Sequence, residues 1–299
     1  MRTAALVLAL ACLGACTRPE HSAERALIEF ERMSFVPAGR LRLDGFPPPL
    51  DDYTLARPLL ADSFEFSWGD WRALARAERA LAPAADSDPL VLSGFERGAD
   101  DRPAVLGWRA AAALAEARGM RLPTPEEWTY LACGTAGLRY PWGPRDQNSV
   151  ANTLELGLAR TATVGTFEGG RGPFGHYDLV GNVWEWVDGA VRGIEDGADS
   201  YPEPQLAHGP CSAMGGSFRV RRRELYVPAK RDEPAARFGL LLDREIVVDD
   251  VGFRAVVDAE TFLLARADLM ARAPDAQLRL RAIGRRIGSA GEPLLRALA

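Results

Sequence analysis

Lysine is nearly absent from this chain, whose positive charge is carried almost entirely by arginine. Lysine occurs once, at Lys230, and the 299 residues carry a net charge of −5. Because nucleic-acid-binding proteins normally have a basic surplus, this charge argues against that class. The chain is long enough to bury a core without the help of a metal or a disulfide. Its 29 glycines and 21 prolines indicate a loop-rich globular protein.

The N-terminus lacks an apolar run long enough to span a membrane. Residues 4–13 are apolar and follow Met1 and Arg2, which is typical of a signal peptide. The run ends in LGAC at Cys16, which resembles the lipobox of bacterial lipoproteins. We predict a signal peptide over 1–16, a lipid on Cys16 and a tether over 17–32. The protein would then be an exported, membrane-anchored bacterial lipoprotein that faces the periplasm or lies on the cell surface. A soluble secretory signal with a chance cysteine is the alternative.

Cysteine is also scarce. Of the four cysteines, Cys12 leaves with the signal peptide and Cys16 carries the lipid, so Cys133 and Cys211 remain as the only thiols. An oxidising compartment permits a disulfide between them. Two separately buried thiols are equally compatible with the sequence.

Two helices are predicted in the middle of the chain. The alanine-rich stretch 107–118 predicts a helix that Gly119 ends. A second helix begins after Thr124, which can cap it, with Pro125 at the first helical position. Glu127 then completes a capping box by accepting from the backbone N–H of the cap.

The remaining segments have less regular patterns. Residues 33–71 indicate short, irregular strands and loops, and residues 134–216 are rich in turns with no predicted helix. From 258 to 299, three short amphipathic stretches predict a helical extension. One such unit cannot bury its own apolar face, so we expect it to pack on the main domain or on a partner.

Five motifs in order resemble the sulfatase-modifying-factor family, the formylglycine-generating-enzyme domain, over residues 33–257. They are RGMRLPTPEEWTYLACG (118–134), RYPWG (139–143), HYDLVGNVWEW (176–186), MGGSF (214–218) and DDVGFRAV (249–256). The resemblance implies a single α+β domain with little regular structure, related to C-type lectins. Residues 258–299 would follow it as a short α-helical extension.

The stretch 176–186 fits neither a helical nor a strand period, and the resemblance offers a reason. In the family this stretch holds calcium, and the matching positions are the side chains of Asp178 and Glu185 and the backbone carbonyls of Gly181 and Val183. Calcium accepts six to eight oxygen ligands in flexible geometry, so a wrapped loop suits it. The alternative is a structural loop in which Glu185 pairs with an arginine and the tryptophans belong to the core.

A second calcium site of the family is matched by Asn152 and Thr153. The aspartate expected a few residues later falls at or near Leu156, and Glu155 is the only nearby carboxylate. The resemblance therefore implies a weaker second site.

The best-known activity of the family, oxidation of a sulfatase cysteine to formylglycine, uses Cu(I) between two cysteine thiolates. The two matching positions here are Val220 and Leu225, and no cysteine follows Cys211. Because soft thiolates select Cu(I), we expect no copper and no such oxidase activity. Trp184 and Ser217 match residues that line the pocket of the family, although each also has an ordinary structural explanation.

A related branch of the family forms sulfoxides on histidine derivatives with iron held by three histidines. The three histidines here, His21, His176 and His208, are scattered, and one lies in the tether. This iron chemistry is therefore not expected.

A cluster of basic residues follows the Gly-Gly-Ser motif. Arginine side chains can bind carboxylate, phosphate or sulfate groups, so an anion-binding patch is one interpretation. The other is that these arginines pair with Glu224, Asp232, Glu233 and Asp249 on a solvated face. The candidate residues are Arg219, Arg221, Arg222 and Arg223, with Lys230, Arg231 and Arg237 nearby.

Three functions remain. The first is a non-catalytic, calcium-stabilised binding or assembly module, anchored to a membrane by lipid, with an unknown protein or ligand as partner. The second is a divergent enzyme that uses the same pocket without the copper site. The third is a structural role in the cell envelope. The fold alone cannot choose among them.

Overall fold

The computed structural model describes residues 32–43, 46, 49–77, 99–191, 208–222, 239–265, 278 and 281–282. The predicted signal peptide, lipidated Cys16 and tether lie outside these residues, as do Arg223 and Leu225. Within the described part of the chain, no helix is both long enough and apolar enough to cross a membrane.

Strands form three small sheets. One sheet has the order β1-β4-β9, a second pairs β2 with β3, and the third has the order β7-β6-β5-β8, in which only the β5-β8 pair is parallel. The strands are β1 (Met33–Val36), β2 (Gly39–Arg42), β3 (Asp52–Leu55), β4 (Leu59–Asp62), β5 (Trp184–Trp186), β6 (Pro210–Met214), β7 (Gly239–Asp243), β8 (Val251–Gly252) and β9 (Val256–Asp258).

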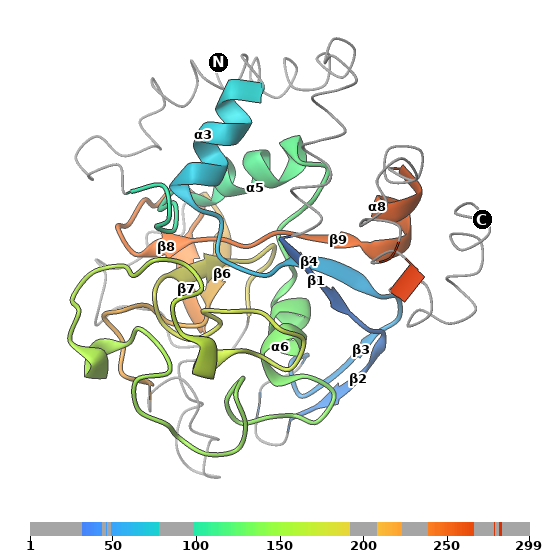
Figure 1. The fold of residues 1–299 in the computed structure, drawn as a ribbon, viewed down its shortest axis with the longest axis horizontal. Coiled ribbons are helices and arrows are strands. Elements are labelled where there is room, and N and C mark those ends of the chain that lie inside the picture. The colour runs from blue at the N-terminus through green and yellow to red at the C-terminus, as the bar shows by residue number, and fades with distance from the viewer. Residues whose placement is uncertain are drawn as a thin grey trace.

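Four α-helices and two short 3₁₀ turns accompany the sheets among the described residues. They are α3 (Trp68–Ala77), α5 (Trp108–Ala117), α6 (Pro125–Cys133), η1 (Leu154–Leu156), η2 (Glu168–Gly170) and α8 (Ala259–Ala265). In Figure 1, α3 and α5 lie together at one end of the molecule, and the long loops between α6 and β5 lie away from them.

The predicted helices over 107–118 and after Thr124 are confirmed as α5 and α6. Thr124 Oγ1 accepts from the backbone N–H of Glu127, and the Glu127 carboxylate accepts from the backbone N–H of Thr124, so the capping box is formed. Gly119 follows α5 with a φ of 68°. Helix α3 was not predicted, because its first turn lies in the segment taken as strands and loops and its remainder was given no assignment. Of the predicted extension, α8 packs against β4 and β9, and most of the remainder lies outside the described residues.

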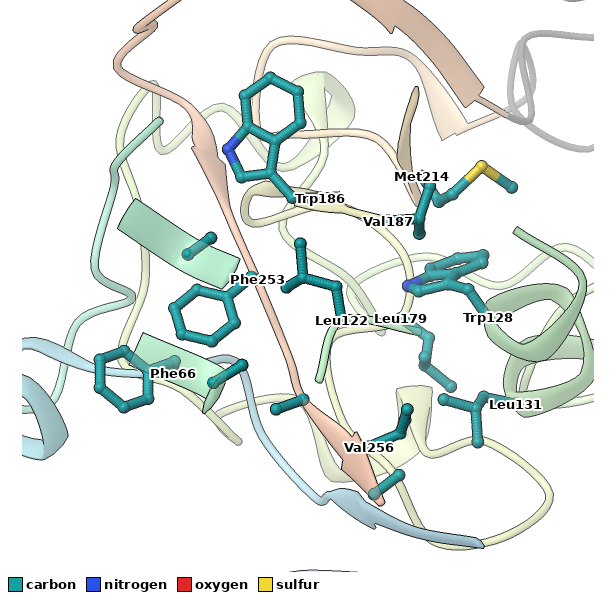
Figure 2. Packing of buried hydrophobic residues seen from close by; sticks show 14 of the residues in the cluster. Phe66, Leu122, Trp128, Leu131, Leu179, Trp186, Val187, Met214, Phe253 and Val256 are labelled. Carbon is teal, nitrogen blue, oxygen red and sulfur yellow. The ribbon is translucent and has the colours of Figure 1, made fainter. Parts of the chain in front are cut away.

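The core joins the helices to the sheets. Figure 2 shows Trp128 of α6 near Leu179 and Met214, and Phe66 beside Phe253. The rings of Phe66 and Phe253 are stacked with centroids 4.7 Å apart. Trp128 is fully buried, and burial of such aromatic rings contributes much of the hydrophobic stabilisation of a domain.

One extended segment passes from the third sheet into the first. Strand β8 ends at Gly252 and β9 begins at Val256, so Phe253 to Ala255 connect the two sheets directly (Figure 1). Arg254 lies in this connection and is completely buried. The segment that connects the two sheets therefore carries a buried charge, and this charge needs compensating partners.

Candidate functional site

The loop from Asp178 to Val183 has an unusual backbone. Asp178, Gly181 and Asn182 all have positive φ angles, of 55°, 79° and 62°. A Cβ at Gly181 would lie 2.3 Å from the carbonyl oxygen of Asn152, so only glycine fits this close approach. The left-handed residues explain the absence of a helical or strand period. The prediction was wrong at one point, because Trp184–Trp186 do form a short strand, β5.

A buried group of three carboxylates and one arginine lies under this loop. Glu65, Asp178, Glu185 and Arg254 are each at most 6% exposed. The Arg254 guanidinium donates to Glu185 Oε1 and Oε2 at 2.5 and 2.6 Å, and to the carbonyls of Asp62 and Tyr177. We call these four residues the carboxylate centre. With all four ionised it would carry a charge of −2, which is an unfavourable state in a buried site.

The electrostatics of the centre reflect this excess of negative charge. Burial, together with the neighbouring charges of Asp178 and Glu185, raises the pKa of Glu65 well above its usual range. Burial also raises the pKa of Asp178 to about 6. These two carboxyl groups therefore tend to keep their protons, and a bound cation would favour their ionised forms.

The four predicted ligands of the first calcium site differ in availability. Asp178 Oδ2 accepts from the N–H of Gly165 at 2.6 Å. Among the described residues, no hydrogen bond uses Asp178 Oδ1 or the carbonyl oxygens of Gly181 and Val183. Both oxygens of Glu185 accept from Arg254, and Oε2 also accepts from Trp128 Nε1 at 2.7 Å. The arginine pair of the alternative interpretation is thus present.

The donor set nevertheless contains the kinds of ligand that a hard cation accepts. It offers buried carboxylates in excess and two unused backbone carbonyls, and calcium prefers oxygen ligands of both kinds. Within the described residues there is no group of three or more His, Cys, Asp and Glu side chains that could hold a metal. A calcium ion would therefore have to be bound largely through Asp178 and the backbone, with Glu185 sharing an oxygen with Arg254.

The second predicted site adjoins the first. Asn152 and Thr153 are buried, and the backbone of Asn152 pairs with Gly181. Within the described part of the chain, Asn152 Oδ1 is a buried acceptor without a hydrogen-bond partner, and a cation could bind to it. Glu155, by contrast, accepts from Thr153 Oγ1 at 2.7 Å and from the N–H of Arg222 at 3.1 Å.

The residues that match the pocket of the family are buried. Ser217 Oγ donates to Asp250 Oδ2 at 2.6 Å, and both side chains are completely buried. Trp184 is 2% exposed, and its Nε1 has no hydrogen-bond partner among the described residues. Val220, at the first copper-ligand position, packs against the hydrophobic core. An aliphatic side chain at this position has no atom that could ligate copper.

The arginine segment, residues 219–222, is largely committed to internal ion pairs. Arg219 pairs with Asp249, as the second interpretation of the basic cluster proposed. Arg222 is 4% exposed and donates to Asp146 Oδ1 at 2.5 Å and to Asn148 Oδ1 at 3.2 Å. Arg221 is exposed. Two of the four candidate anion-binding arginines are therefore already paired with carboxylates.

The two thiols do not pair in the structure. Cys133, at the end of α6, and Cys211, in β6, are free and buried. Burial raises the pKa of each to about 12, so neither is a reactive thiolate at neutral pH. Cys211 Sγ instead donates to the carbonyl of Leu242 at 3.5 Å. Of the two alternatives left open by the sequence, the structure has separately buried thiols.

Sequence reasoning missed two members of the carboxylate centre. Glu65 follows β4 by three residues, in a stretch without any recognised motif, so no signal singled it out. Arg254 lies within the quoted motif DDVGFRAV, and an arginine flanked there by Phe253 and Ala255 could have indicated a buried charge that needs a partner.

Comparison with known proteins identifies the family to which the chain belongs. The model of the sulfatase-modifying factor enzyme 1-like domain matches residues 19–259. The chain belongs to this family. The match spans all three sheets, the carboxylate centre and the stretch 176–186.

Individual relatives match over shorter segments. The formylglycine-generating enzyme of Mus musculus is 38% identical over 171 residues, which cover 51% of this chain and 43% of the relative. The inactive C-alpha-formylglycine-generating enzyme 2 of Bos taurus is 39% identical over 93 residues, covering 27% and 31%. The chain spans less than half the length of these two curated relatives.

A solved structure supports the fold. The crystal structure of CarF is similar with a TM-score of 0.52 and 19% sequence identity, over 76% of this chain and 97% of that chain. This likeness confirms the mixed helix and sheet architecture of a formylglycine-generating-enzyme-like fold. The relationship to C-type lectins stays a prediction.

Proposed function

We propose that this family member is a non-catalytic binding or assembly module, anchored by an N-terminal lipid on the outer side of a bacterial membrane. The observation that carries the proposal is Val220, whose aliphatic side chain packs against the core where the family would place a copper-binding thiolate. The thiols of Cys133 and Cys211 are buried elsewhere and do not replace it. One relative, from Bos taurus, is itself named as inactive.

Calcium would stabilise this module. The centre has three carboxylates for one arginine, and the loop above it has unused carbonyl oxygens at Gly181 and Val183. A bound calcium ion would supply positive charge that Arg254 alone does not. Its contribution would be to folding and rigidity.

An exposed loop beside the arginine segment is the surface that we propose for partner binding. Leu154 and Leu158 lie four positions apart in this loop and are 46% and 43% exposed. The N–H of Leu154 donates to the carbonyl of Val220, so this loop lies against the arginine segment. Arg160, in this loop, and Arg221, in the arginine segment, are also exposed. Apolar side chains flanked by arginine are typical of protein-binding surfaces.

Absence of catalysis is tested with the full-length chain, purified in detergent. It is incubated with Cu(I) and a cysteine-containing sulfatase peptide, and formylglycine is measured by mass spectrometry. We expect no conversion, and elemental analysis should find calcium but no stoichiometric copper or iron. Peptide conversion, or one copper or iron per chain, would overturn the non-catalytic proposal.

Binding is tested by photo-crosslinking in the cells that produce the protein. A photoreactive amino acid replaces Leu158 in one variant and Arg57 in a control, since Arg57 is exposed beside β9. We expect one discrete adduct from position 158 that disappears when Leu154→Asp is added, and no matching adduct from position 57. If neither position forms an adduct, or both form the same one, the proposed surface is wrong.

A further inference from the structure

Asn182 forms hydrogen bonds to several residues that are far from it in the sequence. It is completely buried and has a left-handed φ of 62°. Its Nδ2 donates to Glu65 Oε2 at 2.5 Å, and its Oδ1 accepts from Asn152 Nδ2 at 3.0 Å and from the N–H of Ala162 at 2.7 Å. One side chain therefore joins three segments that are distant in the sequence.

The backbone of Asn182 extends these connections. Its N–H donates to the carbonyl of Asn152 at 2.7 Å, and its own carbonyl accepts from the N–H of Phe218 at 3.1 Å. The neighbouring Val183 N–H donates to Glu65 Oε1 at 3.1 Å. Glu65 thus holds both the Asn182 side chain and the peptide group that leads to Val183.

The amide of Asn152 is oriented by the same network. Its Nδ2 donates to the carbonyl of Arg160 at 2.9 Å and to Asn182 Oδ1, which fixes the plane of the amide. Its Oδ1 is then left buried and without a hydrogen-bond partner among the described residues. A buried acceptor in this state is destabilising, and a bound cation would remove the cost by accepting it as a ligand.

These contacts link the two predicted calcium sites through one residue. Asn152 belongs to the second site, and Gly181 and Val183, on either side of Asn182, belong to the first. A ligand of Asn152 Oδ1 would restrict the Asn152 amide further, and with it Asn182 Oδ1 and the backbone on either side of Asn182. A hydrogen-bonded network of this kind can carry coupling between two sites.

We propose that Asn182, held by Glu65, is a positioning residue that couples the two calcium sites, so that calcium at one site tightens binding at the other. This inference rests on the proposed calcium binding. It goes beyond it, because two independent calcium sites would need no connection between Asn152 and the loop that carries Asn182.

The test is a calorimetric calcium titration of the full-length chain in detergent, with calcium as the only ligand. We expect two ions per chain, the second bound at least about fivefold more tightly than the first, within the usual range of coupling between sites. Two ions bound with equal, independent affinities would overturn the coupling but leave calcium binding intact. A chain that takes up one ion or none would overturn the coupling as well, and no uptake would also remove the calcium proposal.

Two variants separate coupling from folding. Asn182→Gly keeps the left-handed backbone accessible and removes the side-chain contacts. Asn152→Ala removes the second site and its contact to Asn182, and leaves the four predicted ligands of the first site in place. We expect Asn152→Ala to bind one ion, at least about fivefold more weakly than wild type binds at that site. An unchanged affinity at the remaining site would contradict the proposal.

Thermal unfolding of Asn182→Gly provides the matched readout. A merely structural asparagine would lower the melting temperature equally in calcium and in chelator. A positioning residue should in addition reduce the rise in melting temperature that calcium produces. If calcium raises the melting temperature of the variant and of wild type by the same amount, Asn182 does not position the sites.

Discussion

The carboxylate centre and the arginine segment are both groups of charged residues, yet they are built in opposite ways. The centre buries three carboxylates around Arg254, with every side chain at most 6% exposed. The arginine segment gives Arg219 and Arg222 carboxylate partners in Asp249 and Asp146, and those pairs reach the surface. The first region has more carboxylates than arginines. In the second region, Arg219 and Arg222 each have a carboxylate partner.

This difference indicates where a ligand would matter. A buried excess of negative charge is costly and can be relieved by protons or by a cation. Exposed ion pairs are screened by water and contribute little to stability. The centre is therefore the region whose stability should respond to calcium and pH, while the partly exposed pair of Arg219 and Asp249 should respond mainly to salt.

The largest contrast should come from removing one arginine in each region. Arg254→Met leaves Glu185 buried without its partner and should lower the free energy of unfolding by about 3–5 kcal/mol. Arg219→Met breaks the partly exposed pair with Asp249 and a longer, 3.7 Å contact to the buried Asp250, and should cost less, about 1 kcal/mol. Urea unfolding of both variants gives the two values. Equal losses would show that the two regions do not differ as the structure indicates.

Asp178→Asn tests the unbalanced charge directly, because asparagine also tolerates a positive φ. The folded-state pKa of Asp178 is raised to about 6, so the native state holds its proton more tightly than the unfolded chain does. Ionisation of this group therefore reduces stability progressively as pH rises from about 4 to above 6.

In chelator at pH 7.5, Asp178→Asn should consequently be more stable than wild type by about 1–3 kcal/mol, and at pH 4 the two should be equal. Calcium should reverse the order at pH 7.5, because the variant loses a charged ligand. Melting curves at the two pH values, with and without calcium, check the prediction. A variant that is less stable than wild type in chelator at pH 7.5 would contradict it.

Arg222 should give an intermediate effect, since it belongs to the arginine segment but is 4% exposed. Arg222→Ala leaves Asp146 and Asn148 without their buried donor, and we expect a loss of about 1–3 kcal/mol. Unfolding in low salt and in 1 M NaCl distinguishes it from Arg219. The loss at Arg222 should persist in high salt, whereas that at Arg219 should shrink.

The smallest effect is expected at the exposed loop beside the arginine segment. Leu158→Asp replaces a side chain that is 43% exposed and should change the free energy of unfolding by no more than about 0.5 kcal/mol. When the photoreactive amino acid is placed at position 154 instead, the same substitution should remove the crosslinked adduct. A large loss of stability would mean that Leu158 belongs to the core and is not a binding residue.

Two helix ends of this protein could be predicted from the local sequence alone. The capping box at Thr124 and Glu127 and the end of α5 at Gly119 depend on contacts between residues a few positions apart. The family could also be identified from ordered motifs, and the absence of cysteine at 220 and 225 can be read from the sequence alone.

Other features depended on contacts that no local pattern records. Helix α3 was missed because its sequence continues a segment that looks irregular, and the strand β5 exists only because β6 and β8 flank three residues of a wrapped loop. The free state of Cys133 and Cys211 follows from the separate burial of each thiol.

The sequence by itself thus determined the family, the helix ends and the missing copper ligands, since these follow from residue identity and short spacing. Only the tertiary structure brought Glu65, Asp178, Glu185 and Arg254 together, and placed Asn182 between two loops. Residues 65 and 254 are 189 positions apart in the chain, yet the fold brings them close enough for their charges to interact. Pairing at such a distance is a property of the fold, because no short-range preference selects it.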